Sequence, residues 1–320
     1  MIHGRYLDFP DSFFEPEVRC DHYISKEMKK VWAVEMDLLA DLLRVCKKHD
    51  IKIFASGGTL LGAVRHKGYV PWDDDIDMMM FRKDFDKLCE VAPEEFKAPH
   101  FFQSSQTDKV HRGYAKLRNS ETTAVFTGEN DPRLPYNMGI FIDIFPLENL
   151  TTDKKFFKKQ ARKVRRWRAL ALAADDFLSR YYRIDKKGPV WATFVKVLRP
   201  ILKGPLEKHK AVEYCMRKHE RACTLWKDDQ SEDVITMTFD RFEQQEKPKR
   251  RADFQDLIYM PFEFIEIPVG TGYEHALTSK YGDWRKFVKG ASNHGHMIFD
   301  ADTPYREYLE KVGKKKTEDS

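Results

Sequence analysis

Residues 51–81 constrain the fold more than any other part of the chain, because a glycine pair and four aspartates lie between two short apolar runs. The segment reads IKIFASGGTLLGAVRHKGYVPWDDDIDMMMF. The first apolar run ends at Gly57-Gly58, and a helix-like stretch follows over residues 59–66. We therefore expect a strand, a glycine turn, a short helix and a second strand headed by acidic residues.

The aspartates are spaced so that two of them share one face of the second strand. Residues two apart on a strand point to the same side, so Asp75 and Asp77 aim at one spot. Asp73 reaches the same side, and Asp74 is expected to face away. Carboxylates this close repel one another unless a cation lies between them, and Mg²⁺ or Mn²⁺ suits such oxygen ligands. The pattern predicts a divalent metal site; a calcium-binding loop or a solvated acidic turn is the alternative.

A third carboxylate is expected to complete this site. Residues 137–147 read NMGIFIDIFPL, so Asp143 lies inside an otherwise apolar strand. A carboxylate buried there is costly unless it is paired or bound to a metal. We expect Asp143 to be a metal ligand or a general base, and a salt bridge to a nearby Arg or Lys is the alternative.

The glycine pair is a candidate phosphate site. It precedes a helix start, where free backbone N–H groups and the helix dipole attract an anion. We expect the backbone of Gly57, Gly58 and Thr59 to hold phosphate oxygens, and the Thr59 side chain to add a hydroxyl.

Two cations on a further predicted strand, residues 113–118, are candidates for binding a diphosphate. Lys116 and Arg118 are two residues apart, so both face one side of this strand. Such cations bind phosphate when that side faces the site. A strand face exposed to water is the alternative.

Together these residues resemble the signature of the LicD family, which includes bacterial phosphocholine transferases and is related to fukutin and fukutin-related protein. The motifs that carry the resemblance are residues 57–62, 65–68, 71–77, 114–118, 142–147 and 281–284. The resemblance extends from about Val31 to Leu309. Glu148 stands where the family often has Asp, and the spacing from Gly58 to Asp75 exceeds that of most members of the nucleotidyltransferase-fold superfamily, to which the family belongs.

The resemblance implies an α+β fold, with a nucleotidyltransferase-like core of mixed sheet flanked by helices and an appended, mainly helical region. It implies a donor in which CMP is joined through a diphosphate to an alcohol such as choline or ribitol. A hydroxyl of a glycan or lipid-linked glycan would attack the distal phosphorus and release CMP, as in lipopolysaccharide or teichoic acid biosynthesis. Lys116 would stabilise the leaving CMP, and Arg65 would contact the substrate.

Two other functions remain open at this stage. A nucleotidyltransferase that releases pyrophosphate would use the same carboxylates. An inactive, membrane-associated scaffold would bind metal or nucleotide without turnover.

The chain is expected to comprise an N-terminal arm over residues 1–24, a catalytic core over 25–150, a mainly helical region packed on the core over 151–313, and a disordered tail over 314–320. Within these parts we expect a long helix over 26–49 with Ser25 as its N-cap, a turn over 268–272, and a short helix over 273–281 that ends at Gly282.

Composition points to a cytoplasmic protein, because neither a signal peptide nor an apolar run long enough to span a membrane is evident, and the five cysteines are scattered. Nine cations and no acid occupy residues 154–168, and an amphipathic segment follows over 190–202. Two interpretations are open: a solvated helix face with an ordinary core helix, or peripheral contact with an anionic membrane. No motif indicates nucleic-acid binding. We assign the choice of acceptor to the loop 128–137 and to the region after Thr151. His294 and His296 are either a candidate ligand or proton carrier, or part of a surface turn.

Overall fold

The computed structural model describes residues 4–108, 110, 112–126, 136–174, 193, 197, 208–228, 230–238, 247–290 and 297–318. Nearly all of the predicted loop 128–137, most of the amphipathic segment 190–202, and both His294 and His296 lie outside the described residues.

The chain forms two compact units. The first contains Met1–Gln103, Ala115–Leu147 and Lys249–Ser320, and the second contains Ser104–Tyr114 and Glu148–Pro248. Residues 249–320 thus belong with the first unit and not with the helical region in which the sequence analysis placed them. The reason is apolar packing, since Phe262, Ile267 and Leu277 are buried in the same core cluster as the first hundred residues.

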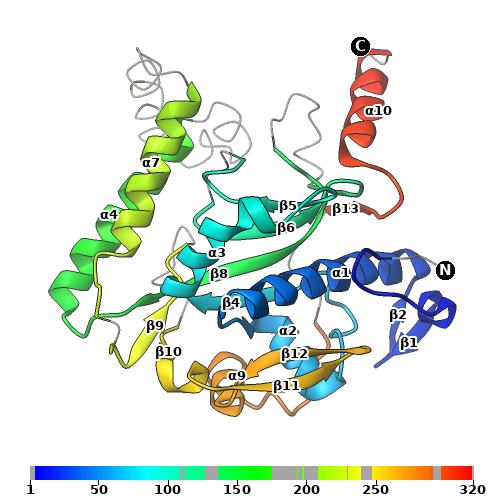
Figure 1. The fold of residues 1–320 in the computed structure, drawn as a ribbon, viewed down its shortest axis with the longest axis horizontal. Helices are drawn as coiled ribbons and strands as arrows, with labels where there is room; N and C mark the ends of the chain where they lie inside the picture. The colour runs from blue at the N-terminus through cyan, green and yellow to red at the C-terminus, as the bar shows by residue number, and fades with distance from the viewer. Residues whose placement is uncertain are drawn as a thin grey trace. The chain divides into compact units, whose positions relative to one another are not determined.

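The first unit is built on a mixed sheet, which makes the fold α+β (Figure 1). Its strand order is β5 (His100–Gln103), β6 (Ala115–Asn119), β8 (Ile140–Asn149), β4 (Asp77–Phe81) and β3 (Phe54–Ala55). Strands β4 and β8 pair in parallel, whereas the other three pairings are antiparallel. The sheet therefore carries the glycine-pair segment and the acidic segment on neighbouring strands.

Helix α1 (Lys26–Lys48) crosses one face of this sheet (Figure 1). Its start is fixed by Ser25, whose hydroxyl accepts a hydrogen bond from the backbone N–H of Met28, as predicted. The apolar stripe of α1 is buried, with Leu38 and Leu42 fully inaccessible. Burying such a side chain contributes about 1.5–3 kcal/mol, so packing determines where this helix lies.

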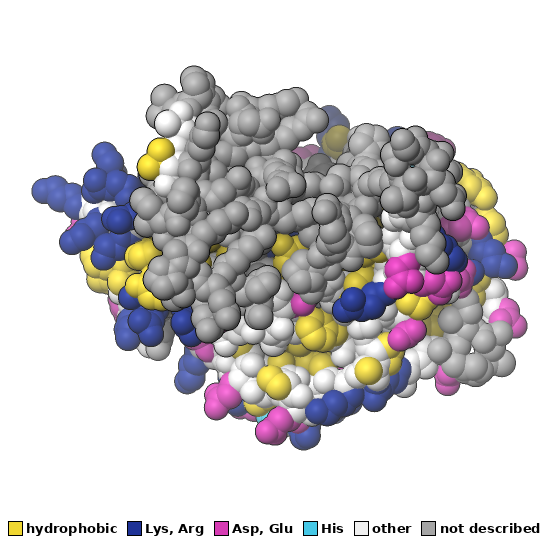
Figure 2. Space-filling model, turned by 90° about the horizontal axis from the view of Figure 1, so that it is seen from above, with side chains coloured by type: hydrophobic (Ala, Val, Ile, Leu, Met, Phe, Trp, Pro, Cys, Tyr) yellow, Lys and Arg dark blue, Asp and Glu magenta, His cyan; other side chains and the backbone are white. Residues whose placement is uncertain are grey.

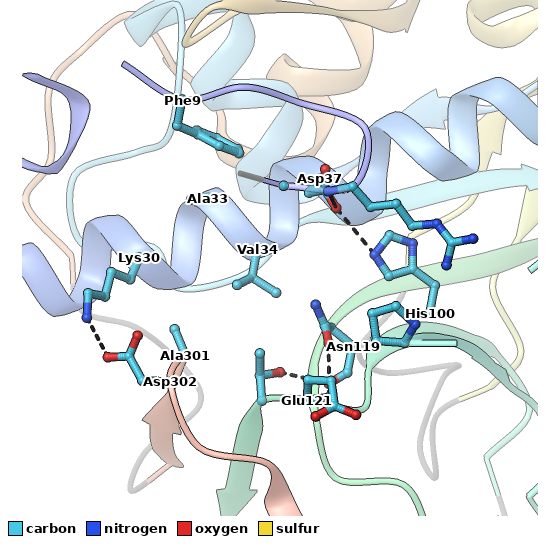
Figure 3. Close-up of a pocket in the computed structure, with 14 residues that line it drawn as sticks. Phe9, Lys30, Ala33, Val34, Asp37, His100, Asn119, Glu121, Ala301 and Asp302 are labelled. Atoms are coloured by element: carbon cyan, nitrogen blue, oxygen red, sulfur yellow. Dashed lines mark hydrogen bonds and ion pairs between the residues drawn. The ribbon is translucent and has the colours of Figure 1, made fainter. Parts of the chain in front are cut away.

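The N-terminal arm is ordered by its aromatic side chains. It contains the short helix η1 (Asp11–Phe14) and a hairpin of β1 (Glu17–Arg19) and β2 (His22–Ile24). Phe9, Phe13 and Phe14 are buried in the core cluster. A pocket of about 370 Å³ lies between this arm, α1 and the end of β6, with Asp37 and His100 pointing toward each other at its edge (Figure 3).

The C-terminal part of the first unit adds a hairpin, two helices and a strand pair. Strands β11 (Leu257–Phe262) and β12 (Ile265–Gly270) form the hairpin, and α9 (Tyr273–Tyr281) follows with the predicted bounds. The predicted turn over 268–272 is wrong for residues 268–270, which belong to β12. Burial of Ile267 and Val269 keeps this segment in the strand. The tight turn of the hairpin lies instead at Glu263, where φ is +54°. Strand β13 (Met297–Asp300) pairs with β7 (Thr123–Phe126).

Helix α10 (Tyr305–Glu318) extends into the predicted disordered tail. An ion pair between Glu307 and Lys311, one turn apart, supports this helix. The predicted start of the tail at Lys314 therefore lies within a helix. Helix α3 (Arg82–Glu95) follows β4 and buries Phe85 and Leu88.

The second unit is dominated by two long helices, α4 (Lys154–Ala174) and α7 (Lys208–Cys223), which pack on each other (Figure 1). Strand β9 (Asp233–Ile235) pairs with the end of β8. Most cations of α4 are exposed. Among the described residues, no helix combines the length and the apolar composition that crossing a bilayer requires.

Candidate active site

Three charged side chains form a row across three adjacent strands. Asp77 on β4 is the register partner of Asp143 on β8, and Asp143 is the register partner of Lys116 on β6. Register partners project from the same face of a sheet. Nζ of Lys116 lies 2.5 Å from Oδ1 of Asp143, and both side chains are buried. The sheet thus brings together residues that are up to 66 positions apart.

Further carboxylates join this row. Oxygen atoms of Asp75, Asp77 and Asp143 lie within 4.8 Å of one another, and Asp73, Asp74 and Asp75 form a second group of the same kind. The structure therefore brings the predicted aspartates together. Asp74 belongs to the second group only, so the expectation that it faces away from Asp77 and Asp143 stays a prediction. Strand β4 begins only at Asp77, so the alternation of a strand does not apply to residues 73–75.

The glycine pair lies directly against two of these carboxylates. Gly57 has a left-handed φ of +53°, and a Cβ there would lie 2.9 Å from Oδ2 of Asp77. A Cβ on Gly58 would lie 2.0 Å from Oδ2 of Asp73. Because real Cβ atoms do not approach oxygen this closely, any larger residue would displace the aspartates. The close approach explains why glycine occupies both positions, and phosphate binding by their backbone stays a prediction.

Asp77 is held by two hydrogen bonds to the same segment. Its backbone N–H donates to Oγ1 of Thr59 over 2.8 Å, and its carbonyl oxygen accepts from the backbone N–H of Ser56 over 2.9 Å. Thr59, predicted to contact phosphate, thus orients the strand start that carries Asp77. The predicted phosphate contact is not tested by these bonds.

The two predicted diphosphate-binding cations are both buried, so the alternative of a strand face exposed to water is wrong. Besides its ion pair with Asp143, the Lys116 ammonium lies 3.2 Å from the centre of the Phe141 ring. Arg118 donates from Nε to Oε1 of Gln103 over 2.6 Å and from a terminal nitrogen to the carbonyl oxygen of Gly139 over 2.7 Å. These contacts give both cations structural partners. Their contact with substrate stays a prediction.

Arg65 lies in the single-turn π-helix η2 (Gly62–His66), which follows the short helix α2 (Gly57–Leu61). A terminal nitrogen of Arg65 donates to the carbonyl oxygen of Trp284 over 2.9 Å. This bond ties the turn after the glycine pair to the segment after α9. The predicted substrate contact of Arg65 stays a prediction.

Lys280 and Tyr281 are site residues that the sequence analysis missed. Nζ of Lys280 would lie 3.2 Å from a Cβ on Gly57, next to the Asp77 carboxylate. Partial burial and the negative charges of Asp73 and Asp77 raise the pKa of Tyr281. The motif over residues 281–284 was the available signal, but nothing in the sequence connects it to the glycine pair.

Glu35 is a third missed residue, on the buried face of α1. Burial raises the pKa of Glu35 well above its usual range, and the charge of Asp75 adds to the effect. Oη of Tyr69 donates to Oε2 of Glu35 over 2.9 Å. The Tyr69 ring stacks on Trp32, whose Nε1 donates to the backbone oxygen of Asp73 over 3.1 Å. This chain of contacts holds the acidic segment against α1.

The donor set fits a hard divalent cation. All the converging ligand atoms are carboxylate oxygens, which Mg²⁺ and Mn²⁺ prefer. Oδ1 of Asp143 is buried and lies 2.5 Å from the Lys116 ammonium, so the salt bridge named as the alternative for Asp143 is present. Metal binding remains a prediction.

Comparison with known proteins agrees with this geometry. Residues 50–178 match the family described as LicD/FKTN/FKRP, nucleotidyltransferase domain. This segment is a LicD-family domain. It contains the glycine pair, the aspartates and Lys116, whereas Glu35 and Lys280 lie outside the matched residues of the LicD-family domain.

Two relatives extend this result. The chain is 26% identical to the lipopolysaccharide cholinephosphotransferase LicD of Haemophilus influenzae. The 257 aligned residues cover 80% of this chain and 91% of the relative. It is also 36% identical over 77 residues to an uncharacterized protein of Rickettsia prowazekii, covering 24% of this chain and 27% of that protein. The first similarity therefore includes most of both chains, whereas the second is local.

Proposed function

We propose that this chain is a phosphotransferase that moves a phospho-alcohol, such as phosphocholine or ribitol phosphate, from a CDP-activated donor to a hydroxyl of a cell-surface glycan or its precursor. CMP is the second product. The similarity to a cholinephosphotransferase over most of both chains supports phosphocholine transfer. The observation that carries the proposal is the close approach of the carboxylates of Asp75, Asp77 and Asp143, inside the segment that matches the LicD family.

In this proposal each group has a defined task. Asp75, Asp77 and Asp143 hold Mg²⁺ or Mn²⁺, with Asp73 as a further ligand. The bound cation supplies positive charge that neutralises the phosphate oxygens of the donor. The backbone of Gly57 and Gly58 and the hydroxyl of Thr59 position those oxygens.

The proton and the leaving group are handled by the row of three charged residues. The acceptor oxygen forms a bond to the distal phosphorus as the bond from that phosphorus to the CMP oxygen breaks. Asp143, if it does not ligate the cation, accepts the proton of the acceptor hydroxyl. Lys116, 2.5 Å from Asp143, holds this carboxylate in place, and Lys116, Arg65 and Arg118 lend positive charge to the side where CMP leaves.

The experiment supplies the purified protein and Mg²⁺ with CDP-choline, CDP-ribitol or nucleoside triphosphates, together with a glycan acceptor, and identifies the released nucleotide. We expect CMP release that depends on the CDP-alcohol and the acceptor, and that is lost in Asp77→Asn. Asp86→Asn, on the exposed face of α3, is the matched control. Pyrophosphate release from a triphosphate with both CDP-alcohols untouched would overturn the proposal in favour of a nucleotidyltransferase.

We also propose that α4 holds the protein at the inner face of the membrane, and the charge on the surface of this helix supports the proposal. Figure 2 shows Lys and Arg side chains gathered on the surface of the second unit, to which α4 and α7 belong. The exposed cations of α4 are Lys154, Lys155, Lys158, Lys159, Arg162, Lys163, Arg165 and Arg166. A face with this charge attracts anionic lipid headgroups. We expect the wild type to co-sediment with anionic vesicles at low salt. We expect this binding to be lost when Lys158, Arg162 and Arg165 are replaced by Gln. Equal sedimentation of the triple variant and the wild type would contradict the proposal.

A further inference from the structure

An indole group of α1 is bonded to the backbone of the acidic segment, residues 73–75. Nε1 of Trp32 donates to the backbone oxygen of Asp73 over 3.1 Å, and the Trp32 side chain is fully buried. Strand β4 begins only at Asp77, so the hydrogen-bond ladder of the sheet does not include this segment. The bond from Trp32 therefore ties an irregular stretch of backbone to a long helix, within the first unit.

The Trp32 indole is itself held in one orientation. Its ring lies parallel to the Tyr69 ring, with the ring centres 4.3 Å apart, and Oη of Tyr69 donates to Oε2 of Glu35, one turn later on α1, over 2.9 Å. The Lys29 ammonium lies 5.4 Å from the centre of the Trp32 ring. Side chains packed this densely do not rotate freely, so the indole N–H is a fixed donor.

The residue that accepts this bond belongs to the carboxylate groups of the candidate site. Oxygen atoms of residues 73–75 lie within 4.8 Å of one another, and an oxygen of Asp75 lies within the same distance of Asp77 and Asp143. Mg²⁺ requires a nearly ideal octahedron of oxygens, so small shifts of its carboxylates cost affinity. The backbone position of Asp73 therefore matters for both groups.

We propose that Trp32 is a positioning residue of the divalent-cation site and that it acts through the backbone of Asp73. The inference rests on the proposed function for the presence of the cation, but it requires neither the donor nor the acceptor. Trp32 does not touch the cation; its N–H holds the carbonyl of Asp73, so that the carboxylates of Asp73 and Asp75 keep the spacing that a cation needs. Trp32 lies outside residues 50–178, the segment that matches the LicD family.

The first test measures Mn²⁺ affinity of the folded protein, separately from turnover. Trp32→Phe keeps an aromatic ring but removes the donor, and we expect it to weaken Mn²⁺ binding by roughly 10-fold. Trp226→Phe is the matched control, because Nε1 of Trp226 donates to Oγ of Ser231 over 2.9 Å in the second unit. This variant loses an indole hydrogen bond as well and is expected to keep the wild-type affinity. Tyr69→Phe keeps the stacked ring and the Trp32 donor, so we expect it to stay within about threefold of the wild type.

The second test uses the wild type and does not depend on the folding of any variant. The indole N–H signals of ¹⁵N-labelled tryptophan are followed by NMR while Mg²⁺ is added. We expect the Trp32 signal to shift in step with Mg²⁺ binding and the Trp226 signal to stay in place. A residue that only stabilises the fold would show neither this shift nor a change in Mn²⁺ affinity.

Three outcomes overturn the inference. They are wild-type Mn²⁺ affinity in Trp32→Phe, an equal loss of affinity in Trp32→Phe and Trp226→Phe, and a Trp32 indole signal that does not respond to Mg²⁺. Absence of Mn²⁺ binding by the wild type overturns it as well. If Trp32→Phe binds Mn²⁺ more weakly but the wild type never turns over a CDP-alcohol, the proposed function fails and the positioning role of Trp32 stands.

Discussion

Asp77 and Asp143 are register partners on the parallel strands β4 and β8, and their carboxylates converge with that of Asp75. The two residues differ in their other neighbours. Asp143 is buried with the Lys116 ammonium 2.5 Å away, whereas Asp77 is only partly buried and lies close to the carboxylates of Asp75 and Asp143. Neutralising one or the other should therefore change the stability of the protein in opposite directions.

Asp77→Asn is expected to stabilise the metal-free protein and to inactivate it. Removing one negative charge relieves repulsion within the group, and active sites commonly trade stability for function in this way. We expect a rise of about 1 kcal/mol in the free energy of unfolding without metal, a smaller stabilisation by added Mg²⁺, and a loss of activity of roughly 100-fold or more. Urea denaturation with and without Mg²⁺ measures the first two. Asp86→Asn, which lies on the surface of α3, should change neither, and equal Mg²⁺ stabilisation of wild type and Asp77→Asn would contradict the metal assignment.

Asp143→Asn is expected to destabilise the protein, because it leaves the buried Lys116 ammonium without its carboxylate. Breaking one side of a buried ion pair costs about 3–5 kcal/mol. The double change Asp143→Asn with Lys116→Met should recover part of this loss. Denaturation of the two single variants and the double variant gives the coupling energy directly, and Lys311→Gln, which breaks an exposed pair with Glu307, is the control with a change near zero. Additive losses would show that the pair does not stabilise the fold.

Gly58→Ala should disturb the site through Asp73. The added methyl group would lie 2.0 Å from Oδ2 of Asp73, so this carboxylate must move. We expect a destabilisation of about 1–3 kcal/mol and a large loss of activity. The double variant Gly58→Ala with Asp73→Ala removes the clashing carboxylate and should recover the stability but not the activity. The clash is not the cause of the destabilisation if Asp73→Ala alone is as stable as Gly58→Ala and the destabilisations of the two single variants add up in the double variant.

The sequence predicted the central aspartates because their signals are local. Asp143 in an apolar strand and Asp75 with Asp77 at a spacing of two are features of short segments, and the long amphipathic pattern likewise predicted α1 almost to its ends. The strand itself begins later than the acidic segment before it suggests, at Asp77.

The missed residues depend on contacts between distant parts of the chain. Glu35 reads as one more position on a helix, and only the packing of α1 places it next to the charge of Asp75. Lys280 reads as a surface cation at a helix end, and only the return of residues 249–320 to the first unit places it at Gly57. The turn predicted over 268–272 failed for the same reason, because burial of Val269 outweighed the local turn signal.

His100 ties the N-terminal arm and α1 to the sheet through a buried charged cluster (Figure 3). Its Nδ1 lies 2.8 Å from Oδ2 of Asp41, and its Nε2 lies 3.3 Å from Oδ2 of Asp37. Asp37 in turn accepts the backbone N–H groups of Arg5, Tyr6 and Leu7. Burial alone would lower the pKa of His100, but the bonds to Asp37 and Asp41 outweigh it and raise the pKa.

The raised pKa of His100 predicts that stability falls as pH rises. A histidine in the unfolded chain has a pKa of about 6.5, so the folded protein binds the proton more tightly. The stabilisation is fully present below about pH 6.5 and is lost as pH rises through the folded pKa. We expect the free energy of unfolding to decrease from pH 6 to pH 9 in the wild type, and this decrease to be smaller in His100→Gln. His22→Gln, a change in the β1–β2 hairpin, should keep the wild-type slope. An NMR titration that finds the His100 ring at or below its ordinary pKa would contradict the charged cluster.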